Sequence, residues 1–241
     1  MYILKNSDII TTLGKRQEDA LDKLGIKSYI RVPNAVDIPD WNADDILYDK
    51  SAQQINILHL STLIETKGFS NYVEALKLLP KNNNWNAILC GPVLFTKYCK
   101  TFSTIKQKEE YVLQNIEYLS PYSTWIRGAY GIEKFELFKN ADIFIFPSTF
   151  NAESLPLVVL EAAASGCAII CTKVGEIPNY FSNDEILFLD SPDAKEISDK
   201  VQQLLLNKNT IQKYKYNAYQ KYLRFFSKEA YKLNWISLFN Q

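Results

Sequence analysis

Two glutamates eight positions apart, Glu153 and Glu161, are the side chains of this 241-residue chain whose type and spacing best suit chemistry. They stand in the otherwise apolar run NAESLPLVVLEAAASG, residues 151–166. A buried, unpaired carboxylate costs several kcal/mol, so a glutamate in such a run favours a bound ligand, for example two vicinal hydroxyls accepted by the carboxylate. Two simpler interpretations stay open: Glu161 facing solvent, and Glu153 acting as a helix cap.

The same run has the punctuation of a helix, with Pro156 at the first turn and Gly166 just past the end. The first amides of a helix have no partner within it and favour an anion. The amides of Ser154, Leu155 and Leu157 lie near or in that first turn. The sequence therefore predicts an anion-binding site where this helix begins.

Two further turns follow strand-like runs. Lys67 stands in TLIETKGFS, after the apolar run 55–61, and could neutralise a phosphate, although an ordinary surface lysine is the alternative. Gly91 ends the run 86–91. Because ligands of open parallel sheets bind at the carboxyl ends of the strands, we expect these turns and the two-glutamate run to share one rim.

The elements that must position these residues alternate between strand and helix. Strand patterns are mostly apolar on both faces, which predicts an α/β fold with a parallel sheet and helices on both sides. The expected strands are 29–34, 55–61, 86–91, 123–130, 142–148 and 168–176, and the expected helices are 69–80, 132–141, 156–166 and 191–207, the last with a capping serine, Ser191. Residues 94–122 read as one or two amphipathic helices.

Composition shifts divide the chain into four parts. Residues 37–54 are polar and acidic and are expected to be a linker, which leaves 1–36 as a small separate piece. Residues 55–207 form the main α/β domain. Residues 208–241 are expected to be C-terminal helices, basic and aromatic in character, and such a face could lie on an anionic membrane.

Several function classes are disfavoured. Lys+Arg and Asp+Glu both number 27, which argues against a nucleic-acid-binding surface as the main role. No GxGxxG motif occurs in the sequence, which argues against a nicotinamide or flavin enzyme. His59 is the only histidine and the four cysteines form no CxxC pair, so we expect no metal and no other cofactor. A cytoplasmic, reduced protein is the expectation, including one at the inner face of a membrane.

Taken in order, these motifs resemble the C-terminal, donor-binding half of a family-4 retaining glycosyltransferase of the GT-B fold. The signature of that family, Glu, seven residues, Glu, is here ESLPLVVLE, within FPSTFNAESLPLVVLEAAASGCAIICTKVGEIPNYF. RVPNAVDIP, LSTLIETKGFSNYVEAL and WIRGAYGIEKFELFKNADIFIFPS resemble further family segments, so that the likeness covers roughly residues 8–240. The resemblance implies a Rossmann-like, nucleotide-sugar-binding domain of such an enzyme at 55–207. It also implies that the C-terminal helices at 208–241 would cross back and dock their aromatic face on the N-terminal domain, which is the alternative to a membrane surface.

The resemblance also implies roles in binding a nucleotide-diphosphate sugar. Glu153 would bind hydroxyls of the donor sugar near the reacting centre, and Glu161 the ribose hydroxyls. Lys67 would neutralise the diphosphate. The other donor-binding residues that it implies are Thr62, Gly91, Arg127 or its neighbours beside the base, and the amides of Ser154, Leu155 and Leu157.

The sequence departs from the family in two ways. Ser61-Thr62 replaces a usual Gly-Arg, which removes a phosphate-binding arginine, and residues 1–36 resemble only the end of the N-terminal acceptor domain. We therefore expect the chain to bind nucleotide sugar with little or no transfer on its own. The activity implied is retaining sugar transfer to a glycan or lipid-linked acceptor. The alternative is a non-catalytic subunit or split-gene product that needs a separate N-terminal polypeptide.

Overall fold

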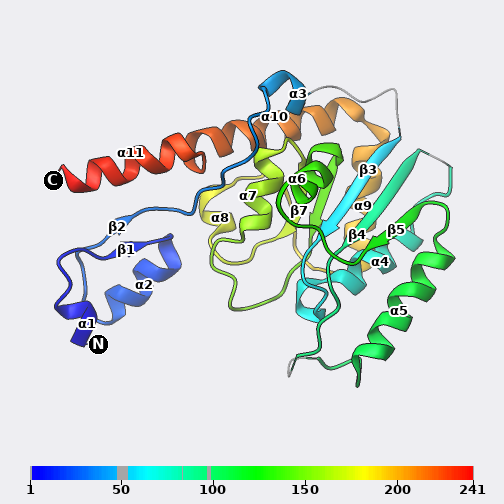
Figure 1. Ribbon diagram of the computed structural model, residues 1–241, viewed down its shortest axis with the longest axis horizontal. Coiled ribbons are helices and arrows are strands. Elements are labelled where there is room, and N and C mark those ends of the chain that lie inside the picture. The colour runs from blue at the N-terminus through cyan, green and yellow to red at the C-terminus, as the bar shows by residue number, and fades with distance from the viewer. Residues whose placement is uncertain (1, 48–53, 83, 97–98, 241) are drawn as a thin grey trace.

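A six-stranded parallel sheet forms the centre of the molecule in the computed structural model, which describes residues 2–47, 54–82, 84–96 and 99–240 (Figure 1). The strand order is β5-β4-β3-β6-β7-β8. The strands are β3 (Ile55–Leu60), β4 (Trp85–Cys90), β5 (Ser123–Ile126), β6 (Ile143–Phe146), β7 (Ala168–Thr172) and β8 (Ile186–Leu189). The first five confirm predicted strands, whereas β8 lies in a stretch to which the sequence assigned no element.

The order of the strands reverses between β3 and β6. The chain moves outward from β3 to β4 and β5, and then crosses back to place β6 on the other side of β3. Ligands of such sheets bind at this switch point, outside the carboxyl ends of the strands. The turns after the two strands are in contact there, since the amide of Thr149 donates to the carbonyl of Thr66 at 2.7 Å.

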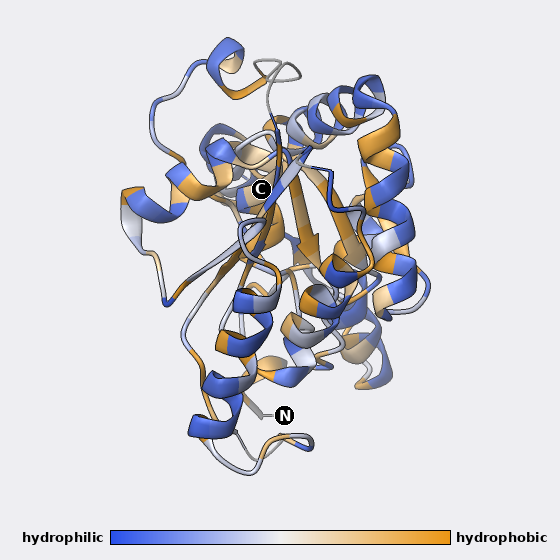
Figure 2. Cartoon of the chain, turned by 90° about the vertical axis from the view of Figure 1, so that its right-hand side faces the viewer, coloured by the Kyte–Doolittle hydropathy of each residue, from blue (hydrophilic) through white to orange (hydrophobic). Residues whose placement is uncertain are grey.

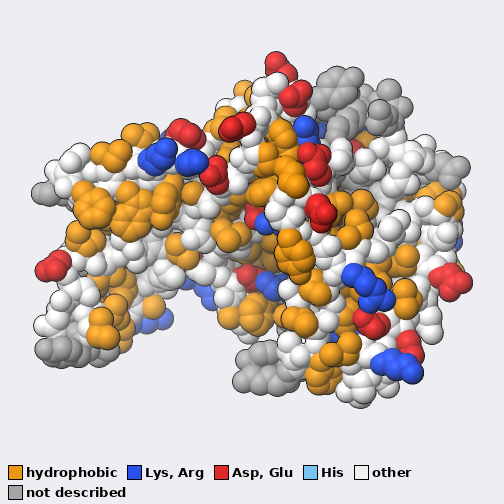
Figure 3. All heavy atoms as spheres, viewed as in Figure 1, with side chains coloured by type: hydrophobic (Ala, Val, Ile, Leu, Met, Phe, Trp, Pro, Cys, Tyr) orange, Lys and Arg blue, Asp and Glu red, His pale blue; other side chains and the backbone are white. Residues whose placement is uncertain are grey.

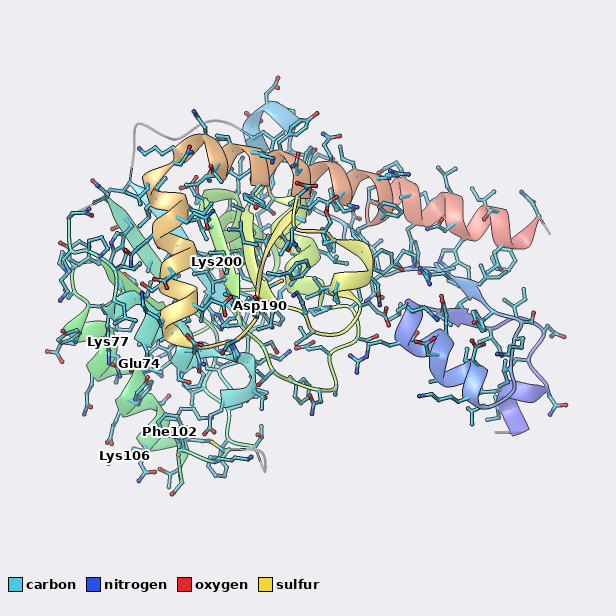
Figure 4. The ribbon with its side chains drawn as sticks, turned by 180° about the vertical axis from the view of Figure 1, so that it is seen from behind. Glu74, Lys77, Phe102, Lys106, Asp190 and Lys200 are labelled. Carbon is cyan, nitrogen blue, oxygen red and sulfur yellow. The ribbon has the colours of Figure 1, made fainter. Side chains whose placement is uncertain are left out.

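Successive residues of the strands feed two hydrophobic clusters, one on each face. Leu58 of β3 and Phe144 of β6 pack on one side with α6, α7 and α10, whereas Ile57 and Ile145 pack on the other with α4, α5 and α9. Figure 2 shows the apolar sheet between these helices, and Figure 4 shows the rear face, with the charged Glu74, Lys77, Lys106 and Lys200 on α4, α5 and α9. The helices are α4 (Phe69–Lys77), α5 (Ile105–Tyr118), α6 (Gly131–Asn140), α7 (Leu157–Ala164), α8 (Ile177–Tyr180), α9 (Ala194–Leu206) and α10 (Lys208–Phe225).

Two helix starts differ from the prediction. Pro156 is the residue that precedes α7, with an extended ψ of 117°, so it directs the chain into the helix rather than occupying its first turn. The cap of α9 is Asp193, whose side chain accepts from the amide of Glu196, and the prediction of Ser191 as the cap was wrong. A carboxylate accepts a hydrogen bond from the free amide and is also stabilised by the positive end of the helix dipole.

The segment expected to hold one or two helices holds one, α5, among its described residues. Two contacts fasten it to the turn that follows β3. The carboxylate of Glu65 accepts from the amide of Thr101 at 3.0 Å. The fully buried ammonium of Lys108 donates to the carbonyls of Leu63 and Leu94 at 3.4 and 2.7 Å. The turn after β3 is therefore held in place by α5 and the residues just before it.

The chain ends lie beside this body. Residues before the linker form α1 (Tyr2–Lys5), α2 (Lys15–Lys23) and a parallel pair of β1 (Thr11–Thr12) and β2 (Ile30–Arg31), while the linker holds α3 (Ala43–Leu47) and residues 48–53, which are outside the described residues. The final helix, α11 (Lys228–Phe239), continues from α10 away from the sheet, on the same side of the molecule as α1 and α2 (Figure 1). The domain boundaries themselves stay a prediction.

Apolar side chains gather over α11 on the face drawn in Figure 3. Leu233, Ile236 and Phe239 are all more than half exposed. Docking on another domain and contact with a membrane surface both stay predictions for this face. Across the described ranges, none of the helices has both the length and the apolar character that crossing a bilayer requires.

Candidate functional site

Lys67 and Glu153 meet at the switch point of the sheet. Lys67 ends the short 3-10 helix η1 (Glu65–Lys67) after β3, and Glu153 lies in the loop after β6. The ammonium of Lys67 is ion-paired with Oε1 of Glu153, and both side chains are largely buried. The hydroxyl of Ser148 lies 3.4 Å from the same oxygen, and the ring of Phe150 lies 5.2 Å from the ammonium. The predicted phosphate-binding and sugar-binding residues are thus direct neighbours.

Two glycines allow the surrounding turns to approach so closely. Gly68 follows Lys67 with a φ of 79°, and a Cβ there would lie 2.4 Å from the carbonyl oxygen of Pro147. At Gly91, a Cβ would lie 1.7 Å from the carbonyl oxygen of Ser61. A side chain at either position would push apart the strand ends that form the site. The role of Gly91 in the structure is therefore close backbone packing beneath the turn after β3.

Backbone amides without an acceptor lie at the start of α7. Within the described part of the chain, the amides of Ser154, Leu155 and Leu157 bond no acceptor. The carbonyls of this loop are held from behind, because the amide of Glu176 donates to the oxygen of Ser154 at 2.6 Å and the side chain of Asn34 donates to that of Leu155 at 3.2 Å. The arrangement offers hydrogen-bond donors to an anion beside Lys67.

Glu161 is buried, with 6% of its surface exposed, so the interpretation of a solvent-facing glutamate was wrong. Its Oε1 accepts from the ammonium of Lys134 on α6 at 2.5 Å. Its Oε2 is buried and has no hydrogen-bond partner among the described residues. A buried carboxylate oxygen without a partner is costly, which is the feature expected where a ligand hydroxyl binds. Glu153 precedes α7 by four residues and so lies outside the helix that carries Glu161.

Thr62 and Arg127 both lie near contacts made within the protein. The backbone oxygen of Thr62 lies 3.1 Å from the hydroxyl oxygen of Ser61, and the side chain of Thr62 brings no charge to the turn. The guanidinium of Arg127 pairs with Glu109 of α5 at 2.7 Å and lies 4.2 Å from the ring centroid of Trp125. The side chain of Arg127 is thus engaged with α5 and its own strand, while its backbone stays at the carboxyl end of β5.

His59 lies inside the sheet next to the site. It is fully buried, with Nδ1 3.0 Å from the carbonyl oxygen of Ile145 and Nε2 2.9 Å from the hydroxyl of Ser61. Burial lowers the pKa of His59 to about 4. The neutral ring therefore donates from Nδ1 to Ile145 and accepts the Ser61 hydroxyl at Nε2. His59 fixes the residue that begins the turn after β3.

Helix α2 contacts the loop that carries Glu153, and these contacts were not evident from the sequence. The guanidinium of Arg16 donates to the backbone carbonyl of Glu153 at 3.3 Å, and the side-chain amide of Gln17 lies 3.5 Å from the hydroxyl of Ser154. The backbone amide of Arg16 donates to the buried carboxylate of Glu176 at 2.8 Å. These partners stand more than 130 positions apart, and no local pattern reports such pairing. Lys134, the partner of Glu161, was also missed.

A comparison with known families bears directly on this site. The family described as Glycosyl transferases group 1 matches residues 48–221. The chain belongs to this family. The match covers more than half of the chain and includes both glutamates, Lys67 and Lys134. Among curated proteins, this glycosyltransferase chain is 33% identical over 84 residues to the sulfoquinovosyl transferase SQD2 of Arabidopsis thaliana.

Solved structures support the fold of this group 1 glycosyltransferase chain. Sucrose-phosphate synthase from Thermosynechococcus elongatus matches all of the chain with a TM-score of 0.76 and 21% identity. HepE from Anabaena, solved with UDP and glucose, matches 99% of it with a TM-score of 0.77 and 16% identity. The C-terminal domain of a group 1 glycosyl transferase, LpcC, from Francisella tularensis matches 79% with a TM-score of 0.60 and 24% identity. The fold is thus the Rossmann-like one of GT-B glycosyltransferases, as predicted.

The chain spans only part of these relatives. It covers 59% of the sucrose-phosphate synthase chain, 64% of the HepE chain and 16% of SQD2, but it corresponds to 95% of the isolated LpcC domain.

Proposed function

We propose that this chain binds a nucleotide-diphosphate sugar at the switch point of its sheet and serves retaining transfer of the sugar to a glycan or lipid-linked acceptor. The observation that carries the proposal is the grouping of a lysine, unbonded amides, the largely buried Glu153 and the buried Glu161 in the segments that follow β3 and β6. Membership of a glycosyltransferase family and the UDP and glucose bound to the structural neighbour HepE support it.

Each group has a task that its chemistry suits. In the reaction, the bond between the anomeric carbon and the diphosphate breaks, the acceptor oxygen forms the new bond to that carbon, and the acceptor's proton passes to the departing phosphate oxygen. Negative charge grows on the diphosphate, where Lys67 and the amides of Ser154, Leu155 and Leu157 stabilise it. Glu153 binds hydroxyls of the sugar, and Glu161 binds the ribose of the nucleotide.

Binding is tested by titrating the chain with UDP, GDP and ADP sugars in a calorimeter. We expect one nucleotide class to bind, and we expect the isolated chain to show little transfer because it covers only 59% and 64% of the sucrose-phosphate synthase and HepE chains that it matches. The absence of heat with every nucleotide sugar in the panel would contradict the proposal.

A second candidate is a non-catalytic nucleotide-sugar-binding subunit, or one half of a split enzyme, that works beside a separate N-terminal polypeptide. The observation that favours it is Thr62, which brings no charge to the phosphate-binding turn. The two candidates differ in one measurement. Sugar transfer by the isolated chain to any acceptor would eliminate the second candidate.

Glu161→Ala is expected to weaken binding of the nucleotide by about 10- to 100-fold, since hydrogen bonds to a buried carboxylate are worth about 1.5–3 kcal/mol. Calorimetry with the nucleoside diphosphate checks this. The matched control is Glu133→Ala, an exposed glutamate of α6. Equal affinity of the Glu161→Ala variant and the native chain would refute the role of Glu161.

Lys67→Met is expected to lower the affinity for a nucleoside diphosphate by about tenfold or more, while affinity for the nucleoside changes much less, because only the phosphates carry charge for the ammonium to bind. The effect should shrink as salt is added. Lys173→Met is the control, since Lys173 lies in a half-exposed pair with Asp190. A uniform loss for nucleoside and diphosphate would point to a packing role instead.

A further inference from the structure

We propose that Lys134 is a ribose-binding residue that acts together with Glu161, so that a lysine–glutamate pair, rather than a glutamate alone, recognises the two hydroxyls of the nucleotide ribose. This inference rests on the proposed function. It assigns a role to a side chain that the sequence motifs did not single out.

The first support is the geometry of the pair. The ammonium of Lys134 lies 2.5 Å from Oε1 of Glu161, and neither side chain is more than a quarter exposed. The stem of Lys134 is held in place, with its ammonium 5.0 Å from the ring centroid of Phe135. The pair is therefore fixed rather than a fluctuating surface contact.

The second support is the division of the two carboxylate oxygens. Lys134 occupies Oε1, while Oε2 is buried and bonds nothing among the described residues. Each hydroxyl of a vicinal diol can donate one hydrogen and accept another. One ribose hydroxyl can therefore donate to Oε2 of Glu161, while the oxygen of its neighbour accepts from the ammonium of Lys134. An ammonium has three donors, of which Glu161 uses one.

The third support is the position of Lys134 in the fold. It lies in the first turn of α6, which begins five residues after β5 ends, at the rim where the sheet binds its ligand. Residues of α6 and α7 pack against each other and bring Lys134 from one side and Glu161 from the other. Lys134 thus follows closely in the chain on Arg127 and its neighbours, which the family resemblance places beside the base.

The fourth support is charge. A lone buried carboxylate close to a diphosphate would repel the ligand, and the charge of Lys134 cancels that of Glu161. The pair is neutral as a whole but still presents one acceptor and at least one donor. These are the groups needed to distinguish a ribose from a deoxyribose.

The test compares nucleoside diphosphates that differ only in a ribose hydroxyl. The native chain, Lys134→Met and Lys134→Arg are titrated with UDP, GDP and ADP and then with the 2′-deoxy and 3′-deoxy forms of whichever binds. We expect the native chain to prefer the ribonucleotide over at least one deoxy form by about 10- to 100-fold. Lys134→Met should reduce that ratio to a few-fold, and Lys134→Arg should keep most of it.

The matched control is Lys139→Met, which removes a lysine from the same helix whose ammonium lies 4.6 Å from the ring centroid of Trp41. Its preference should equal that of the native chain. A Lys134→Met variant that loses affinity for both forms equally, or keeps the native ratio, overturns the assignment while leaving the proposed function intact. A native chain that binds none of the diphosphates overturns the proposed function, and the role of Lys134 with it.

Discussion

Asp142→Asn is expected to lower the free energy of unfolding by about 3–5 kcal/mol, the usual loss when one partner of a buried ion pair is removed. Asp142 precedes β6, and its Oδ1 lies 3.2 Å from the ammonium of Lys215 on α10, with both side chains almost completely buried. The Oδ2 atom of Asp142 accepts a hydrogen bond from the backbone amide of Asn56 at 3.0 Å. Asparagine would leave the ammonium of Lys215 buried without a counter-charge.

The double variant Asp142→Asn/Lys215→Met separates the charge effect from packing. The asparagine oxygen can still accept from Asn56, and no charge remains buried, so we expect the double variant to recover most of the lost stability in urea denaturation. Lys213→Met is the control on the same helix, because Lys213 pairs with Asp184 at 3.9 Å on the surface and should change stability by less than about 0.5 kcal/mol. Losses that simply add would show that the two side chains do not act as a pair.

The second large effect is a dependence of stability on pH that a single side chain imposes. Burial lowers the pKa of His59 to about 4 in the folded chain, from 6.5. Between these values the unfolded chain binds a proton that the folded chain does not, so stability is full above about pH 6.5 and falls as the pH drops toward 4. The loss is about 3 kcal/mol, since each unit of pKa is worth about 1.4 kcal/mol.

The chain is well suited to this measurement because His59 is its only histidine. Denaturation of the native chain and of His59→Asn at several pH values isolates the imidazole from the carboxylates, which titrate in both proteins. We expect the variant to show a flatter profile between pH 4 and 6.5. The single imidazole resonance provides an independent check by NMR, and titration of the folded protein near pH 6.5 would disprove the account.

Much of the fold could be predicted because local patterns determine it. The runs at 55–61 and 142–148 are apolar on both faces since each strand is covered by helices on both sides, and that pattern needs no partner to be visible. The strand β8 escaped notice because ILFL, at 186–189, is only four residues long and cannot be distinguished from a buried loop by periodicity. The capping residue of α9 was misassigned for a related reason, since Ser191 and Asp193 are both good caps and only the backbone decides between them.

The site residues also divide into those that the sequence indicates and those that it does not. Glu153, Glu161 and Lys67 could be singled out because each conflicts with its local surroundings or stands at a strand end. Their partners could not, because Lys134 is one of many lysines on amphipathic helices and its contact with Glu161 depends on how α6 packs against α7. Arg127 could likewise be singled out from the sequence, but its pairing with Glu109 could not.

The pairing of Lys67 with Glu153 has a consequence for selectivity. On the proposed function, a free sugar must compete with the ammonium for the carboxylate and can offer only neutral hydroxyls in exchange. A nucleotide sugar brings its own anion, which draws Lys67 to the phosphates and releases the carboxylate to the hydroxyls. Phosphate and sugar recognition then act in sequence, and unactivated sugars of the cell, however abundant, are poor competitors for the donor.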